Sequence, residues 1–444
     1  MRTALPSSLS PPNELDRLAH AVMGRCDAIA ECTEEPGRIT RRYLSAPMRT
    51  VHERIGGWMQ AAGLATRVDH AGNLFGLRRG ACSDRTLLVG SHLDTVPGGG
   101  RYDGVLGVLM GVALAESLGD ARLPFDLEVV GFSEEEGVRY SKPYLGSAAV
   151  AGRFKPAWLA RTDRAGVTVR EAIAEFGGDA DRLEEAAYDP QRVIGYVEPH
   201  LEQGPVLERA AAAVGVVSGI VGQSRLRLEF IGETAHAGTT PMIGRRDALA
   251  PAAAMVGETR RMAESTRGLL ATVGKIDVSP NAPNVVADRV ELALDVRHPS
   301  DASRDLAVDR LVERARELAA AERCECRVLE NTPSPATIVD RQLSDRLADA
   351  VTATGVEPLR LPSGAGHDAV MMARRFPVAM LFIRHPGGVS HHPDERCDRD
   401  DVAVGVDTLR RLVLGLAEKP IVRDEPKNHA DRETGAPRLE PGAA

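Results

Sequence analysis

The chain has 444 residues, more than the roughly 250–300 at which a single hydrophobic core stops growing, so two domains are expected. Its 55 Lys and Arg residues against 63 Asp and Glu residues give a net charge of −8, and this mild acidity argues against nucleic acid or an anionic membrane as a general partner. The longest mostly apolar run, residues 104–115, is too short to cross a bilayer and predicts a buried helix.

The two ends of the sequence are predicted to lie outside the packed domains. The N-terminal segment lacks the continuous apolar stretch and cleavage site of a secretory signal, which predicts a cytoplasmic protein, and residues 1–12 are expected to be disordered. Residues 418–444 are polar and rich in proline, with too little apolar content to pack, so they are predicted to form a tail.

The first large region has the pattern of an α/β domain built on a mainly parallel sheet. Residues 13–60 are amphipathic with helical periodicity, and short apolar strands then alternate with helices. Predicted strands include Thr86–Gly90, Asp126–Phe132 and Val378–Ile383, and polar clusters follow the last two directly. Ligands bind outside the carboxyl ends of the strands in open α/β sheets, so these clusters are candidate site segments.

The order of the predicted elements changes near residue 215 and predicts an inserted α+β domain of ferredoxin-like type. The predicted elements run strand, helix, strand, strand, helix, strand: residues 224–232, 246–266, 270–278, 289–297, 303–322 and 324–329. We therefore predict a larger domain formed by residues 1–214 and 330–417, interrupted by a smaller domain at residues 215–329.

Acidic and imidazole side chains gather in a few glycine-rich or proline-rich segments. In SHLDTVPGGGRYDG, His92 and Asp94 alternate along an extended segment, so Asp94 can hold one ring nitrogen while the other binds a metal. Such a pair alone is also typical of a solvated loop. The segment also contains Asp103, and further candidates lie in SEEEG, HLEQGP and GGVSHHPDE.

Together these side chains form a nitrogen and oxygen ligand set that suits Zn²⁺, Mn²⁺, Co²⁺ or Ni²⁺. An aspartate with two oxygens can bridge two ions, and a spare carboxylate beside them can take a proton from water and pass it to a leaving nitrogen. Each residue taken singly also fits a surface role, so the prediction depends on their convergence.

Seven motifs follow one another in the chain: HLDTV, GGGRYDGVLGV, SEEEGVRY, HLEQGP, HAGTTPM, SGAGHDA and GGVSHHPDE. In this order and spacing they resemble the amidase/hydantoinase/carbamoylase branch of the M20 metallopeptidase family, over roughly residues 15–415. This branch includes allantoate amidohydrolases, N-carbamoyl-L-amino-acid hydrolases and β-alanine synthases. The resemblance implies a metallohydrolase domain with an inserted domain that serves as lid and dimerisation element.

The resemblance also implies a site that holds two divalent ions per subunit, with Zn²⁺ or Mn²⁺ expected and Co²⁺ or Ni²⁺ also compatible. Asp103 is the implied bridging ligand, Glu135 the general base and acid, and Asp94 the residue that orients His92. His391, the first of two adjacent histidines, matches the family's SHxPxE pattern. The implied metal ligands are His92, Asp103, Glu136, His200 and His391.

Other matching positions imply contacts to a small ureido-carboxylate substrate. The Arg297 guanidinium is suited to a carboxylate because it donates two parallel hydrogen bonds. By the same resemblance, His236 reaches the active site of a partner subunit and stabilises an oxyanion, which implies a homodimer formed through the inserted domain. The implied substrate residues are Gln203, His236, Asn284, Arg297 and His367.

The predicted reaction is hydrolysis of a ureido C–N bond. The stretch EEEGVRYSKPYLGSAAVAG is most similar to allantoate amidohydrolases, which release ammonia and CO₂ from allantoate and leave ureidoglycine. The alternative is an N-carbamoyl-L-amino-acid hydrolase or β-ureidopropionase. A dipeptidase or aminoacylase with the same metals, and a non-catalytic binding protein on the same scaffold, are further alternatives. Because Arg297 lies in the inserted domain, that domain is predicted to open and close near residues 214 and 330.

Overall fold

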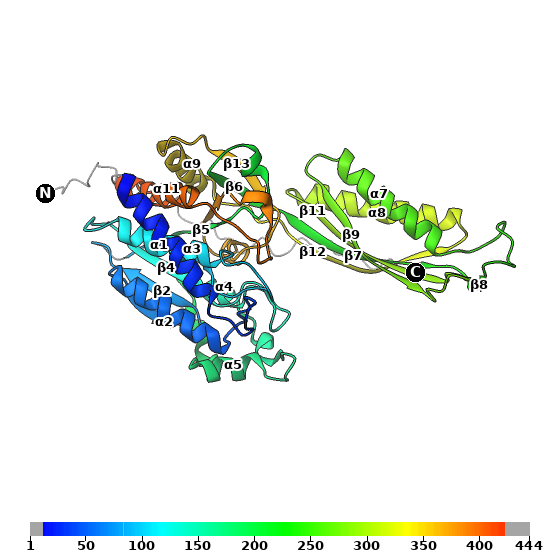
Figure 1. Ribbon diagram of the computed structural model, residues 1–444, viewed down its shortest axis with the longest axis horizontal. Helices are drawn as coiled ribbons and strands as arrows, with labels where there is room; N and C mark the ends of the chain where they lie inside the picture. The colour runs from blue at the N-terminus through cyan, green and yellow to red at the C-terminus, as the bar shows by residue number, and fades with distance from the viewer. Residues whose placement is uncertain (1–11, 83, 422–444) are drawn as a thin grey trace, which may run out of the picture.

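The computed structural model describes residues 12–82 and 84–421, and the predictions for the first 11 residues and for residues 422–444 lie outside this part of the chain. A large body with helices around a sheet continues into a narrower, elongated second body (Figure 1). No helix among the described residues has both the length and the apolar character needed to cross a membrane.

The large body is built on an eight-stranded mixed sheet. Strands β4, β3, β5 and β14 are parallel neighbours, β13 is parallel to β6, and the β1–β2, β2–β4 and β14–β6 pairs are antiparallel. The predicted mixed α/β fold with a mostly parallel sheet is confirmed. Across the sheet the strands are β1(Ala65–Val68), β2(Leu74–Arg78), β4(Asp126–Phe132), β3(Thr86–His92), β5(Val193–Leu201), β14(Val378–Ile383), β6(Val214–Ile220) and β13(Leu359–Ser363).

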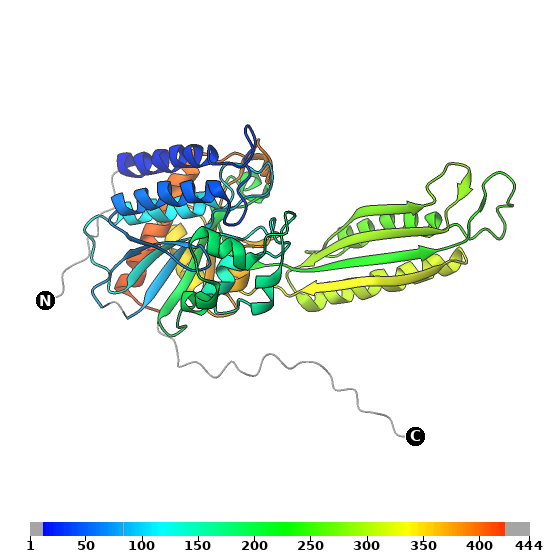
Figure 2. The ribbon, with the colours of Figure 1, turned by 90° about the horizontal axis from the view of Figure 1, so that it is seen from below.

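Helices bury both faces of this sheet. One face is covered by α1(Pro12–Ala30), α2(Ala46–Ala61), α3(Val105–Ser117), α9(Arg341–Ala353) and α11(Arg399–Glu418), whose apolar side chains share one core with the strands. Figure 2 shows α1 and α2 lying over this face. Helix α3 is the predicted buried helix, and nearly every residue of it is buried because it packs between the sheet and the outer helices α1 and α11.

Shorter elements lie on the other face and around the rim. Helices α4(Leu145–Val150) and α10(Ala369–Met372) contribute to a second core with the sheet. The remaining helical segments are α5(Val169–Phe176), α6(Val206–Arg209), η1(Pro156–Ala160), η2(Ala180–Ala186) and η3(Pro386–Gly388).

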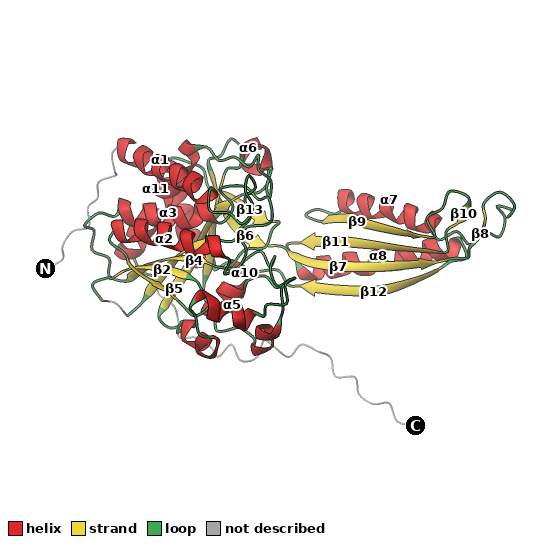
Figure 3. Cartoon of the chain, turned by 60° about the horizontal axis from the view of Figure 1, so that its bottom comes forward, coloured by secondary structure: helices red, strands yellow, loops and turns green. Residues whose placement is uncertain are grey.

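The elongated body is a separate antiparallel sheet with its own apolar core. Helices α7(Leu249–Ser265) and α8(Asp301–Ala321) pack on one face of it (Figure 3). Its strands across the sheet are β12(Glu325–Ser334), β7(Gly222–Ile231), β11(Arg289–His298) and β9(Leu270–Ser279). Along the chain the order is strand, helix, strand, strand, helix, strand, apart from the short strands β8(Ala235–His236) and β10(Val285–Val286).

The second sheet is inserted between strands of the first. The chain leaves the large sheet after β6, builds the elongated body, and returns through α9 to β13 and β14. The short β8–β10 pair lies at the end of the elongated body that is farthest from the large sheet (Figure 1).

Candidate functional site

The histidines and carboxylates singled out from the sequence follow neighbouring parallel strands. His92 is the last residue of β3, and His200 is near the end of β5. Glu135 and Glu136 come directly after β4, and His391 follows β14. Because β4, β3, β5 and β14 are adjacent and parallel, their carboxyl ends meet at one edge of the sheet. The fold therefore collects these side chains from distant parts of the sequence.

Asp103 lies at the centre of this cluster. Its Oδ1 is 3.2 Å from His200 Nε2 and 3.9 Å from His92 Nε2. Its other oxygen, Oδ2, is 3.3 Å from His391 Nε2, which lies 3.7 Å from Glu136 Oε1. The two oxygens of one carboxylate thus face different imidazoles, the arrangement of a bridging ligand between two cations.

Three overlapping groups of side chains present ligand atoms within 4.8 Å of one another: His92, Asp103 and His200; Asp103, Glu136 and His391; and His92, Glu135 and Glu136. The first group is buried, whereas the second opens toward solvent because half of the His391 side chain is exposed.

A glycine allows the Asp103 loop to approach His92. Gly104 has a φ of +69°, which L-residues rarely adopt, and a Cβ added there would lie 2.4 Å from the His92 ring. The glycine after Asp103 is therefore required both by the backbone and by the imidazole packed against it.

Asp94 joins the segment of His92 to the segment of the glutamates. Its carboxylate accepts the backbone N–H of Glu135 at 3.0 Å and that of Glu136 at 3.1 Å. His92 Nδ1 lies 3.0 Å from the main-chain oxygen of Asp94 and 3.5 Å from its Oδ1. Asp94 thus contacts the ring nitrogen of His92 that faces away from Asp103, and it also fixes the turn that carries Glu135 and Glu136.

The charges of the cluster need a cationic complement. Burial and the neighbouring Glu136 raise the pKa of Glu135 well above its usual value, and burial together with Asp103 raises the pKa of Glu136 to about 7. Burial opposes ionisation of Asp103, but hydrogen bonding to His200 and His391 holds its pKa well below its usual range. Glu136 Oε1 is buried and has no hydrogen-bond partner among the described residues. Divalent cations fit this donor set because they would satisfy the orphaned oxygen and offset the crowded carboxylates.

Two of the predicted substrate residues border the cluster. Gln203 Nε2 donates to Asp103 Oδ1 at 3.3 Å and to Ser390 Oγ at 2.8 Å. The buried His367 ring packs edge-on against His200 with 4.4 Å between ring centroids, and its Nε2 is 2.9 Å from Ser363 Oγ. Burial and the nearby His200 lower the pKa of His367 well below its usual value, which favours the neutral form of this ring.

Arg297 reaches from the second sheet to the large body. Its Nη1 donates to the main-chain oxygen of Gly364 at 2.6 Å, in the loop that leads to His367. Its Nε and Nη2 donate to the two oxygens of Asp295 at 2.7 Å and 3.0 Å. Sequence reasoning missed this pairing, although residues 295 and 297 alternate along one strand and so share a face.

His236 and Asn284 are not brought to the cluster within this chain. His236 lies on β8 and pairs with Val285, while Asn284 accepts the N–H of Ala237 through its main-chain oxygen at 3.0 Å. Both belong to the far end of the elongated body (Figure 3). The two residues are thus neighbours of each other and remote from Asp103.

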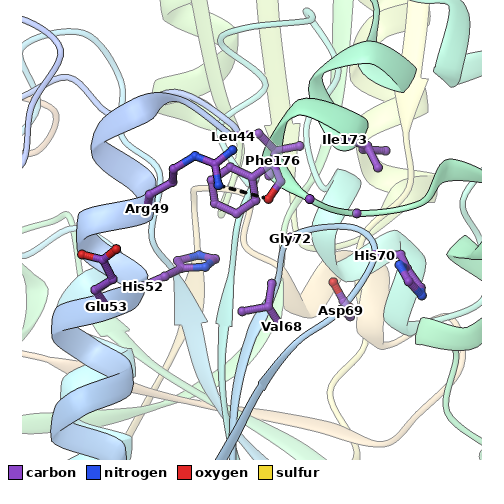
Figure 4. Close-up of a pocket in the computed structure, with 12 residues that line it drawn as sticks. Leu44, Arg49, His52, Glu53, Val68, Asp69, His70, Gly72, Ile173 and Phe176 are labelled. Carbon is purple, nitrogen blue, oxygen red and sulfur yellow. Dashed lines mark hydrogen bonds between the residues drawn. The ribbon is translucent and has the colours of Figure 1, made fainter.

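A separate cavity of about 320 Å³ lies between α2, the β1–β2 turn and the end of α5 (Figure 4). His52, Val68 and Phe176 line it, and Arg49 stacks over the Phe176 ring at 4.6 Å. Burial lowers the pKa of His52 to about 4. None of the predicted site residues lines this cavity, so the cluster and the cavity are distinct features.

The chain is similar to known proteins over most of its length. A family model described as peptidase family M20/M25/M40 matches residues 88–415. The chain is 38% identical over 397 residues to an N-carbamoyl-L-amino acid amidohydrolase of Geobacillus stearothermophilus, with 88% of this chain and 96% of the relative aligned. It is 35% identical over 432 residues to an allantoate deiminase of Arabidopsis thaliana, with 89% and 82% aligned.

Solved structures show the same likeness. A hydantoinase/carbamoylase family amidase from Burkholderia multivorans superposes with a TM-score of 0.84 at 31% identity, covering 91% of this chain and 98% of that one.

Proposed function

The chain belongs to peptidase family M20/M25/M40, and we propose that it hydrolyses the ureido C–N bond of a small carboxylate substrate at the cluster around Asp103. The observation that carries the proposal is the Asp103 carboxylate, whose two oxygens face different imidazoles next to the buried carboxylates Glu135 and Glu136. The relatives named as amidohydrolases and deiminases of ureido compounds support the same reaction class.

Two divalent ions per subunit complete the proposed site, with Zn²⁺ or Mn²⁺ expected and Co²⁺ or Ni²⁺ also suited to the ligands. Bound there, they supply Lewis acidity that polarises a carbonyl oxygen and lowers the pKa of water. One ion is proposed to bind to His92, Asp103 and His200, and the other to Asp103, Glu136 and His391.

Glu135 is the proposed general base and acid. It is buried beside His92 and Glu136 with its pKa raised well above the usual value, and a carboxyl in this position can both take and return a proton. We assign it the removal of a proton from the attacking water and the delivery of that proton to the departing nitrogen. Asp94 holds Glu135 in place through the backbone N–H of that residue.

Arg297 is the proposed clamp for the substrate carboxylate. Its contact with Gly364 places it beside the loop of His367, and Asp295 keeps its guanidinium plane fixed. Gln203 and His367 are proposed to contact the substrate from the large body. The elongated domain then acts as a lid that opens and closes near residues 214 and 330 and excludes water when closed.

The distant position of His236 and Asn284 supports a homodimer in which each inserted domain completes the site of the other subunit. Mixing H236A and E135Q proteins tests this. Hybrid dimers would contain one site with an intact Glu135 and an intact His236, so activity would appear although both parents are inactive. No recovery after dissociation and reassociation of the subunits would contradict the proposed dimer.

Allantoate is the proposed substrate, and N-carbamoyl-L-amino acids or N-carbamoyl-β-alanine are the alternative, because relatives of both names resemble the chain over most of its length. Protein reloaded with Mn²⁺ is offered each compound, and ammonia release gives kcat/KM. The highest value with allantoate is expected, and a preference for N-carbamoyl-L-amino acids would replace it by the alternative. Turnover of dipeptides or N-acyl amino acids without ureido turnover would indicate a peptidase or aminoacylase. Binding without any turnover would indicate a non-catalytic protein.

A further inference from the structure

Glu395 is a buried carboxylate to which the proposed reaction gives no role. It is 3% exposed and lies four residues after His391, in the segment SHHPDE. Its Oε1 accepts the backbone N–H of Tyr102 at 2.8 Å and that of Asp103 at 3.0 Å. One side chain thus ties the loop of His391 to the loop of Asp103, although 292 residues separate Glu395 from Asp103.

The loop before Asp103 is shaped to receive this carboxylate. A Cβ added at Gly100 would lie 2.3 Å from both the carboxyl carbon and Oε1 of Glu395. Any side chain at position 100 would therefore push the carboxylate away from the two N–H groups that it accepts. Glycine is therefore needed at position 100, the third glycine of GGGRYDG, because the Glu395 carboxylate packs directly against its backbone.

The two candidate ion positions differ in how firmly the fold holds their ligands. His92 and His200 belong to central strands and are almost fully buried. His391 lies on a loop, has a φ of +56° and exposes half of its side chain. Two side chains of this loop hold it to the rest of the site. Ser390 accepts a hydrogen bond from Gln203, and Glu395 accepts the backbone N–H groups of Tyr102 and Asp103.

We propose that Glu395 is a positioning residue that holds Asp103 and His391 in register for the ion between Asp103, Glu136 and His391. The inference rests on the proposed dinuclear site. Without Glu395, the Asp103 backbone loses its acceptor and the His391 loop loses its tie, so the Asp103–His391 distance becomes variable. The position at His92 and His200 keeps its strand-borne ligands. Loss of Glu395 therefore weakens the ion at Asp103, Glu136 and His391 more than the other ion, which shares only Asp103 with it.

Titration of the metal-free full-length protein with Mn²⁺, followed calorimetrically, tests this role. In E395A the affinity of one ion falls by about 10-fold or more, as for other residues that orient metal ligands, and the affinity of the other ion falls much less. E395Q restores most of the affinity, since an amide oxygen accepts the same two N–H groups. G100A reproduces the selective loss by displacing the carboxylate, which provides a second test if E395A does not fold.

D189A is the control. Asp189 also accepts a backbone N–H group, that of Gln191 at 3.0 Å, but precedes the start of β5, at the opposite end of the strand from His200, so both affinities stay unchanged. Two ions bound by E395A with wild-type affinity would overturn the proposal, and so would equal weakening of both. Ureido turnover by the wild-type protein tests the proposed function separately. An inactive wild-type protein whose second ion still depends on Glu395 would contradict that function and support the positioning role.

Discussion

Replacing Asp94 with asparagine tests the hydrogen bonds that join the end of the His92 strand to the turn of Glu135 and Glu136. Asp94 is 1% exposed, and each of its oxygens accepts a different backbone N–H, from Glu135 and from Glu136. Asparagine has one acceptor oxygen and an amino group that donates, so one of these buried N–H groups loses its partner and faces another donor. Leaving such a group unsatisfied costs about 1–3 kcal/mol of folding free energy. Loss of this hydrogen bond also displaces the turn that carries Glu135 and Glu136, and we expect kcat to fall by about 10- to 100-fold.

Urea unfolding of the metal-free protein measures the folding cost of D94N, and steady-state kinetics with saturating Mn²⁺ measure the loss of turnover. D179N is the control, because the Asp179 side chain accepts a single backbone N–H, from Asp181, and asparagine keeps that acceptor. A D94N protein that unfolds at the same urea concentration as D179N and retains wild-type kcat would show that Asp94 does not hold the turn of Glu135 and Glu136.

Three further predictions concern other parts of the chain. E135Q is expected to lower kcat by about 10²- to 10⁴-fold while calorimetry still finds wild-type metal binding, because the amide cannot carry the proton; unchanged turnover would exclude Glu135 as the base. R297A is expected to raise KM for a carboxylate substrate by about 10-fold or more with far less effect on its carboxamide analogue, because only the carboxylate pairs with the guanidinium; equal losses for both would remove the clamp role. Burial lowers the pKa of His52 from its usual 6.5 to about 4, so the neutral ring stabilises the fold fully above pH 6.5 and that contribution is lost as the pH falls toward 4. Between pH 6.5 and 4 the unfolding free energy of H52F is therefore expected to fall by about 3 kcal/mol less than that of the wild type. H20Q, at an exposed site, is the control and should follow the wild type. A pH profile of H52F identical to that of the wild type would contradict this role of His52.

The strands and the convergence of polar residues could be predicted because the signals are local. Apolar runs such as Asp126–Phe132 specify buried strands, and parallel strands end at one edge, so residues that follow them are brought together. His92, His200 and His391 are the imidazoles that this reasoning indicates, and the structure places them in one cluster with Asp103, which the sequence puts on the glycine-rich loop. The resemblance to a known family supplied the roles of these residues.

The contacts between distant loops could not be predicted in the same way. Glu395 accepts from Tyr102 and from Asp103, 292 residues away along the chain, and no periodicity encodes such a pairing. Asp94 also accepts the backbone N–H groups of Glu135 and Glu136. These contacts depend on how the turn after β4 folds back toward Asp94, which only the three-dimensional structure shows. His236 shows the limit most clearly, since its motif indicates a site residue but its strand lies at the far end of the elongated body (Figure 1).

Anomalous diffraction from crystals grown with Mn²⁺ would locate the two proposed ions in the protein. We expect two peaks on either side of the Asp103 carboxylate, one bordered by His92 and His200 and the other by Glu136 and His391. A map with no ion at Asp103, or with manganese bound only elsewhere on the protein, would contradict this expectation.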